Sequence, residues 1–209
     1  TVPKDNLMII NAIIQCRMTS ERFPGKVLAP FLGKPLLDHI VGQLKKTNFC
    51  SSIILATSSD KADDPLSSYA KELGLEIVRG SREDVVERYA LVLDRHSCNA
   101  FFRVCGDSPL LLPNLFNHAA LIYKNKPYDL ITNVFPRTYP VGMSVELIKT
   151  ETANVQALNI KLSKQKKDKQ ILLKENKVAK LNLDQERIQQ ELLMKDIKAN
   201  LSQYSAQII

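Results

Sequence analysis

Glycine and proline stop abruptly well before the end of this chain. All seven glycines and all ten prolines of the 209 residues lie at or before Gly142. These residues make most tight turns, because glycine reaches left-handed backbone angles and proline fixes its own φ. The first part of the chain can therefore turn often enough to form a compact domain, and the remainder has no strong turn former. We place the boundary near residues 147–155 and predict two parts, 1–150 and 151–209.

Short apolar runs alternate with amphipathic segments throughout the first part. Spacings of three and four residues between apolar positions indicate helices, and short apolar runs bounded by turn formers indicate strands. We predict strands over residues 8–15, 52–56, 76–79, 100–104 and 130–133, and helices over residues 35–45, 65–73, 84–94 and 114–123. Such alternation is typical of βαβ units. The predicted fold class is α/β, with a Rossmann-like, mostly parallel sheet.

The second part, residues 151–209, is rich in Lys, Leu, Gln, Glu and Ala, which favour helix. Apolar residues recur at three- and four-residue steps over 178–192 and again over 194–208, but the two sets are out of register. This pattern predicts a long, coiled-coil-like helical segment with a phase slip. A helix of this kind needs a partner to bury its apolar stripe, so we expect a possible homo-oligomer.

The net charge of +7 raises the question of a nucleic-acid partner. The tail has eleven basic residues against seven acidic ones, and much of the remaining excess gathers in one loop of the first part. A phosphate-rich small molecule explains that loop as well as a nucleic acid does. Aromatic residues for base stacking are sparse in the tail. We therefore expect no nucleic-acid partner.

Targeting features are not recognisable in this sequence. We find no apolar run long enough for a membrane span and no secretory signal, so we expect no membrane contact. The four cysteines have neither CxxC spacing nor a histidine partner, which predicts reduced thiols. Together these observations predict a cytoplasmic protein.

A basic loop, residues 15–26, follows the first predicted strand directly. It has Arg17, Arg22 and Lys26 within ten residues, with Ser20 between them. Ligands of open α/β sheets bind at the carboxyl ends of the strands. Guanidinium forks and an ammonium group together suit a triphosphate, although the spacing is not that of a Walker loop. The alternative is a solvated basic loop without a ligand.

A Gly106-Asp107 pair follows the predicted strand over residues 100–104. The carboxyl ends of parallel strands meet at one edge of a sheet, so we expect Asp107 to lie near the basic loop. Mg²⁺ is usually bound by one or two carboxylates together with substrate phosphates. The alternative is an aspartate that caps the next helix or closes a turn.

The two motifs, in this order, resemble those of the cytidylyltransferases of CMP-sugar synthesis, particularly proteins like spore coat polysaccharide biosynthesis protein F. The resemblance covers residues 8–148. It implies a GT-A-like nucleotidyltransferase domain that uses Mg²⁺ and transfers CMP from CTP to a sugar, releasing pyrophosphate. The sugar would be sialic-acid-like or another acidic sugar, used in the synthesis of surface polysaccharide.

The resemblance also implies roles for individual residues of this chain. Arg17, Arg22 and Lys26 would stabilise charge during the transfer, and Asp107 would bind the metal. The implied nucleotide-binding residues are Gln15, Arg17, Ser20, Arg22, Lys26, Gly80, Ser81, Asp84, Arg88 and Gly106. The implied acceptor-binding residues are Asn133, Arg137, Tyr139 and Glu146.

Beyond about residue 148 the sequence departs from the family pattern. The late segment that supplies a second metal-binding carboxylate and dimer contacts has no recognisable counterpart, so we expect a truncated domain. Glu146 is a candidate substitute for that carboxylate. Two alternative functions remain: a related nucleotidyltransferase that uses another triphosphate, and a catalytically impaired nucleotide-binding domain whose helical tail mediates assembly.

Overall fold

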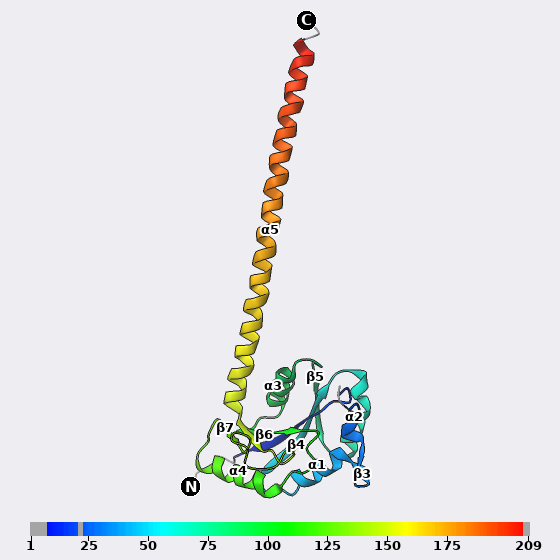
Figure 1. Ribbon diagram of the computed structural model, residues 1–209. Helices are drawn as coiled ribbons and strands as arrows, with labels where there is room; N and C mark the ends of the chain where they lie inside the picture. Colours follow the sequence, from blue (N-terminus) through cyan, green and yellow to red (C-terminus); the bar gives the residue numbers. More distant parts are fainter. Residues whose placement is uncertain (1–7, 21–22, 207–209) are drawn as a thin grey trace. The chain divides into compact units, whose positions relative to one another are not determined.

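The computed structural model describes residues 8–20 and 23–206 (Figure 1). The chain divides into two compact units, of which the first ends at Leu158 and the second begins at Asn159. The predicted domain boundary at residue 150 stays a prediction. One continuous helix begins at Thr150 and runs past the division between Leu158 and Asn159.

The first unit is built on a six-stranded sheet with the strand order β5-β4-β1-β6-β8-β7. Strands β4, β5 and β6 continue the parallel arrangement around β1, whereas β8 is antiparallel to both β6 and β7. The strands are β1 (Ile10–Gln15), β4 (Cys50–Ser58), β5 (Glu76–Gly80), β6 (Ala100–Cys105), β7 (Leu130–Thr132) and β8 (Glu146–Lys149). The predicted α/β class with a mostly parallel sheet is confirmed.

Helices cover both faces of this sheet, as Figure 1 shows. Helices α1 (Leu36–Leu44), α2 (Asp64–Glu72) and α4 (Pro113–Asn125) contribute to the core on one face, and α3 (Val85–Arg95) to the core on the other. A parallel strand that is covered on both faces is apolar along its whole length. Strand β1 follows this rule at four of its first five residues, all of which are buried, and Asn11 is the buried polar exception.

Aromatic contacts join the helices to the sheet. The Phe102 ring of β6 lies 4.8 Å from the Phe116 ring of α4, centroid to centroid. On the opposite face, Tyr89 of α3 stacks on Phe101 at 5.6 Å. Because neighbouring residues of a strand point to opposite faces, β6 supplies one phenylalanine to each core.

Short elements between β1 and α1 were not predicted. A 3-10 helix, η1 (Lys26–Leu28), is followed by the two-residue strands β2 (Pro30–Phe31) and β3 (Lys34–Pro35), which pair with each other. A second 3-10 helix, η2 (Lys61–Asp63), precedes α2. Segments of two or three residues are too short to show a helical or strand period.

The predicted long helix of the tail is α5 (Thr150–Ala206), which contains 57 residues. It exposes several large apolar side chains, including Val155, Leu158, Ile171, Leu172 and Val178. Whether they pair with another helix stays a prediction.

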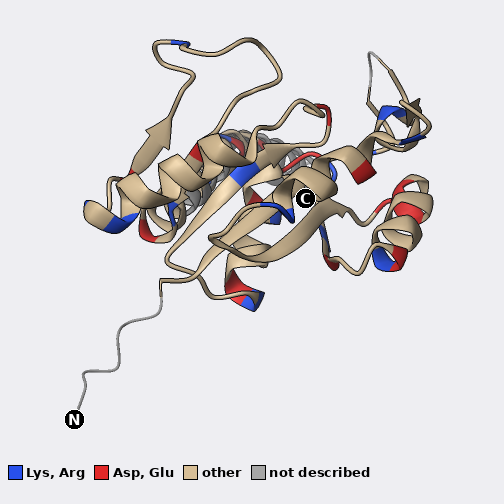
Figure 2. Cartoon of the chain, turned by 90° about the horizontal axis from the view of Figure 1, so that it is seen from below, with Lys and Arg blue, Asp and Glu red and all other residues tan. Residues whose placement is uncertain are grey.

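No helix in the described part of the chain is long and apolar enough to cross a membrane. Acidic and basic residues both occur along helices of the first unit (Figure 2).

Replacing Phe102 by alanine tests the packing of β6 against α4. Phe102 is 1% exposed and contacts another aromatic ring, so Phe102→Ala should lower the free energy of unfolding by about 3–5 kcal/mol. Phe135 is 81% exposed, and Phe135→Ala should change that free energy by less than about 0.5 kcal/mol. Urea denaturation measures both variants, and equal losses would contradict this account of the core.

Candidate active site

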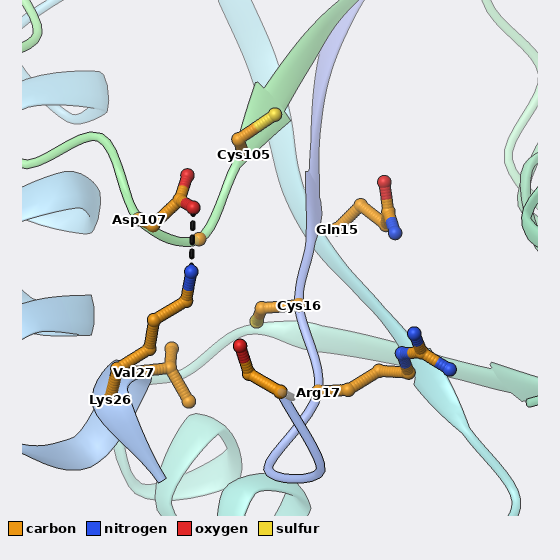
Figure 3. A pocket seen from close by; sticks show the side chains of 9 residues that line it. Gln15, Cys16, Arg17, Lys26, Val27, Cys105 and Asp107 are labelled. Atoms are coloured by element: carbon orange, nitrogen blue, oxygen red, sulfur yellow. Dashed lines mark hydrogen bonds and ion pairs between the residues drawn. The ribbon is translucent and has the colours of Figure 1, made fainter. Parts of the chain in front are cut away.

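The two sequence motifs meet at the carboxyl edge of the sheet. A pocket of about 400 Å³ lies where β1 and β6 end (Figure 3). Its lining residues are Gln15, Cys16, Arg17, Ser20, Lys26, Val27, Cys105, Gly106 and Asp107. Six of the predicted site residues are among them: Gln15, Arg17, Ser20, Lys26, Gly106 and Asp107. Arg22, the remaining predicted residue of the loop, lies outside the described residues.

Backbone hydrogen bonding closes the basic loop at its base. The Gly25 N–H donates to the Met18 carbonyl oxygen at 2.7 Å, which brings the two sides of the loop together. Gly25 has a φ of 71°, a left-handed conformation that favours glycine. Arg17 precedes this closure and Lys26 follows it, so both cations lie next to the point where the loop is fixed.

An ion pair connects the basic loop to the end of β6. Lys26 Nζ lies 2.6 Å from Asp107 Oδ2, and the two side chains point toward each other in Figure 3, with Arg17 on the other side of the pocket. The Lys26 side chain is 25% exposed and the Asp107 side chain 44%. A pair this exposed stabilises a fold by only about 0–1 kcal/mol. Both groups are therefore accessible to a ligand at small energetic cost.

Two guanidinium groups converge on the carbonyl oxygen of Arg82. Arg17 Nη1 donates to it at 2.7 Å and Arg88 Nη1 at 3.0 Å. Arg88 is fully buried, and its Nε and Nη2 have no hydrogen-bond partner among the described residues. Burial and the positive charge of Arg17 lower the pKa of the Arg88 guanidinium. Arg88 does not line the pocket, whereas Arg17 does, so of the two guanidinium groups Arg17 is the one placed to meet a ligand there.

Comparison with known proteins agrees with this geometry. Residues 11–203 match the cytidylyltransferase family. The chain belongs to that family. The match continues past residue 148, where the resemblance of the individual motifs ends, into α5.

Three relatives indicate which cytidylyltransferases this chain is similar to. It is 30% identical over 156 residues to the spore coat polysaccharide biosynthesis protein SpsF of Bacillus subtilis, covering 70% of this chain and 63% of that protein. It is 32% identical over 112 residues to the 3-deoxy-manno-octulosonate cytidylyltransferase of Geobacter metallireducens, covering 54% of this chain and 43% of that one. A cytidylyltransferase structure from Leptospira borgpetersenii superposes with a TM-score of 0.66 at 28% identity, covering 70% of this chain and 63% of that one. The chain thus spans less than two thirds of the length of these relatives.

The predicted residues after β5 shape the turn that leads into α3. Asp84 caps α3 by accepting a hydrogen bond from the Glu87 N–H at 2.9 Å, and Ser81 Oγ accepts one from the Asp84 N–H at 3.1 Å. Arg88 donates to the Ser81 carbonyl oxygen. A Cβ at Gly80 would lie 2.8 Å from Leu91 Cδ1 and 3.1 Å from Arg88 Cγ, so glycine leaves room for both of these α3 side chains. These contacts position Arg88 beside the basic loop.

The four predicted acceptor-binding residues do not line the pocket. Asn133 braces its own segment by donating to the Met143 carbonyl oxygen and accepting from the Val145 N–H, each at 2.9 Å. Arg137 is exposed and lies 3.3 Å from Ser144 Oγ, and Tyr139 is also exposed. Their roles stay predictions.

Glu146 forms an ion pair with Arg103 of β6. Burial disfavours the charged guanidinium, but the charges of Glu146, Cys105 and Tyr89 and the hydrogen bond with Glu146 together outweigh burial and raise the pKa of Arg103. Arg103 is two residues before Cys105, so both side chains point to the same face of β6, and of the two only Cys105 lines the pocket. Sequence reasoning missed Arg103, although a charged residue inside an apolar strand was a usable signal.

Cys16 and Gly106 mark the closest approach of the β1 and β6 ends. A Cβ at Gly106 would lie 2.2 Å from Cys16 Cβ, a distance that folded proteins do not tolerate. Cys16 is buried, and burial, followed by the negative charges of Asp63 and Asp107, raises the pKa of its thiol. All four cysteines are free thiols, as predicted. Cys16 therefore acts as a packing residue at the floor of the pocket.

The residues at this edge fit a magnesium ion bound chiefly through a ligand. Asp107 places an accessible carboxylate at the pocket. No three His, Cys, Asp or Glu side chains cluster at metal-binding distance within the described ranges. Mg²⁺ needs few protein ligands when phosphate oxygens and waters complete its shell. A structural metal with an all-protein ligand set does not fit.

Substituting alanine at two glycines tests the approach of β1 and β6. Gly106→Ala should lower the free energy of unfolding by about 1–3 kcal/mol, because its Cβ overlaps Cys16. Gly42 lies within α1, where a Cβ meets nothing within 4 Å among the described residues. Gly42→Ala should be neutral or stabilising by up to about 1 kcal/mol, because alanine favours helix. Urea denaturation measures both, and a neutral Gly106→Ala would show that the strand ends separate easily.

Proposed function

We propose that this chain transfers CMP from CTP to a sugar hydroxyl and releases pyrophosphate. The observation that carries the proposal is the set of charged groups in one pocket at the sheet edge: Arg17 on one side, and the Lys26–Asp107 pair on the other. Membership of the cytidylyltransferase family supports CTP as the nucleotide.

The chemistry required is a displacement at phosphorus. The acceptor hydroxyl oxygen bonds to the α-phosphorus of CTP while the bond from that phosphorus to the β-phosphate oxygen breaks. The hydroxyl proton is lost to solvent or a nearby base, and pyrophosphate leaves with its electron pair. Such a reaction depends on positioning and charge stabilisation rather than on a covalent enzyme intermediate.

The residues of the pocket can supply both requirements. Arg17 and Lys26 lie on opposite sides of the closed base of the loop and can bind phosphate oxygens from two directions. Arg88 is buried outside the pocket and donates to the same Arg82 carbonyl oxygen as Arg17, which adds positive charge beside Arg17. Asp107 would hold Mg²⁺, which when bound supplies positive charge to the phosphates. Once a ligand displaces the Lys26 ammonium group from Asp107, that ammonium group can stabilise the leaving pyrophosphate.

For the acceptor we propose an acidic sugar. Outside the pocket lining, β6 has Arg103, whose guanidinium forms an ion pair with Glu146, and the segment before β8 has the exposed Arg137. The relative from Geobacter metallireducens is named for 3-deoxy-manno-octulosonate, an acidic sugar. The SpsF relative is named for polysaccharide biosynthesis, which makes a surface polysaccharide the proposed destination of the activated sugar.

Titration calorimetry of CTP with and without Mg²⁺ tests the nucleotide site. The wild-type chain should bind CTP more tightly with Mg²⁺, and Asp107→Ala should remove most of that difference, because it removes the carboxylate at the pocket. Asp64→Ala is a matched control, since Asp64 forms a similar exposed pair with Arg79 at 2.7 Å and does not line the pocket.

The control should bind CTP as the wild type does. Equal losses in the two variants would mean that Asp107 has no special role. A thermal-shift comparison with ATP, GTP and UTP at equal concentration separates CTP from other triphosphates, because the preferred ligand gives the largest stabilisation. Absence of binding by every triphosphate would refute the proposed activity.

Glu146→Gln tests whether Glu146 replaces a second metal-binding carboxylate. Glu146 is paired with Arg103 and does not line the pocket, so we expect the Mg²⁺ dependence of CTP binding to be unchanged. The same calorimetric titration provides the measurement. A loss of Mg²⁺ dependence comparable to that of Asp107→Ala would instead make Glu146 a metal ligand.

A second candidate function is assembly through α5, with or without catalysis. The exposed apolar side chains of this helix favour it, since a long helix with an apolar stripe needs a partner. Sedimentation velocity over a range of concentrations tests it. A single monomeric species at all concentrations would exclude self-association.

A further inference from the structure

A buried carboxylate outside the predicted site contacts the basic loop. Asp63, the last residue of η2, is fully buried. Its Oδ1 accepts a hydrogen bond from the Met18 N–H at 2.7 Å. Its Oδ2 accepts hydrogen bonds from the Thr57 hydroxyl at 3.1 Å, from the Ser58 N–H at 3.2 Å and from the Ser58 hydroxyl. One oxygen therefore binds the loop after β1, and the other binds the end of β4.

These hydrogen bonds keep the carboxylate ionised in spite of its burial. Burial alone would favour the neutral acid, but the donors of Ser58, Met18 and Thr57 outweigh it and lower the pKa of Asp63. A buried carboxylate without such donors would be strongly unfavourable. Its charge also makes each of these bonds stronger than a bond between neutral groups.

The loop is held at Met18 through both the N–H group and the carbonyl group of that residue. Its N–H donates to Asp63, and its carbonyl oxygen accepts from the Gly25 N–H. Arg17 is the residue before Met18, and Lys26 is the residue after Gly25. Any displacement of the Met18 backbone would therefore shift both pocket cations relative to Asp107.

We propose that Asp63 is the positioning residue of the nucleotide loop: it fixes the Met18 backbone to the end of β4 and so sets where Arg17 and Lys26 meet the triphosphate. Asp63 does not line the pocket and contacts no reacting atom. This role rests on the proposed function for the identity of the ligand. The contact between Asp63 and the loop is independent of that function.

Asp63→Ala removes both carboxylate oxygens, and with them the contacts to Met18 and to the end of β4. Asp63→Asn replaces the carboxylate by an amide. In either orientation the new amide nitrogen sets an N–H group against a backbone N–H, that of Met18 or that of Ser58. Asp63→Asn keeps the side-chain volume, so it provides the test if Asp63→Ala fails to fold.

Two matched controls separate positioning from general stability. Thr57→Val removes one donor to Oδ2 and leaves the Oδ1 contact with Met18 in place. Asp38→Asn makes the same chemical change at a carboxylate that accepts from the Tyr69 hydroxyl at 2.7 Å, away from the loop. Urea denaturation identifies the conditions in which every variant is folded, and all comparisons are made there.

The measurements are hydrogen exchange at the Met18 amide and calorimetric CTP affinity in the full chain. In the Asp63 variants, Met18 exchange should accelerate and the CTP dissociation constant should rise, each by roughly tenfold or more. The controls should change each quantity by less than about threefold.

Wild-type exchange at Met18 in a folded Asp63→Ala or Asp63→Asn variant would overturn the proposal. Faster exchange with wild-type CTP affinity would overturn it as well, because the loop would then bind nucleotide without this anchor. Failure of the wild type to bind CTP would refute the proposed function, and the exchange comparison alone would then decide whether Asp63 holds the loop.

Discussion

The parallel pairing of β1 between β4 and β6 is the constraint on which the site depends. Gln15, the last residue of β1, pairs with Ala56 on one side and with Cys105 on the other. The loops that follow these strands therefore start at the same level of the sheet and meet at its carboxyl edge. A slip of one residue would turn every side chain of β1 to the opposite face. Alternate residues of β1 pack into two different cores, Ile10, Ala12 and Ile14 into one and Ile13 into the other, so the packing that stabilises the fold also aligns the pocket.

Charge is distributed unequally along this edge. Toward β6, Lys26 and Asp107 largely neutralise each other. Toward β5, Arg17 and Arg88 both donate to the Arg82 carbonyl oxygen, and neither guanidinium forms an ion pair with a carboxylate among the described residues. The attraction for an anion is therefore strongest on the β5 side, and the β6 side contributes one charge of each sign. An excess of basic residues in the composition does not reveal such a division.

The sequence was sufficient where a residue's role follows from its neighbours in the chain. The alternation of apolar and amphipathic segments predicted the strands and helices, and the rule for parallel strand ends brought Lys26 and Asp107 together. The sequence was insufficient where the role of a residue depends on pairing between distant segments. Arg103 acquires its partner only because β8 lies antiparallel to β6. Asp63 precedes a second aspartate and a proline, which resembles an ordinary helix start, and its contact with Met18 spans 45 positions.

The hydrogen bond between Gly25 and Met18 divides the basic loop into two classes of position. Arg17 and Lys26 lie at its base, where the framework of strands holds them, whereas Ser20 lies within the closed segment. Because Met18 and Gly25 are joined at the base, a substitution at Ser20 can change how this segment meets a ligand without displacing the two cations that the base holds.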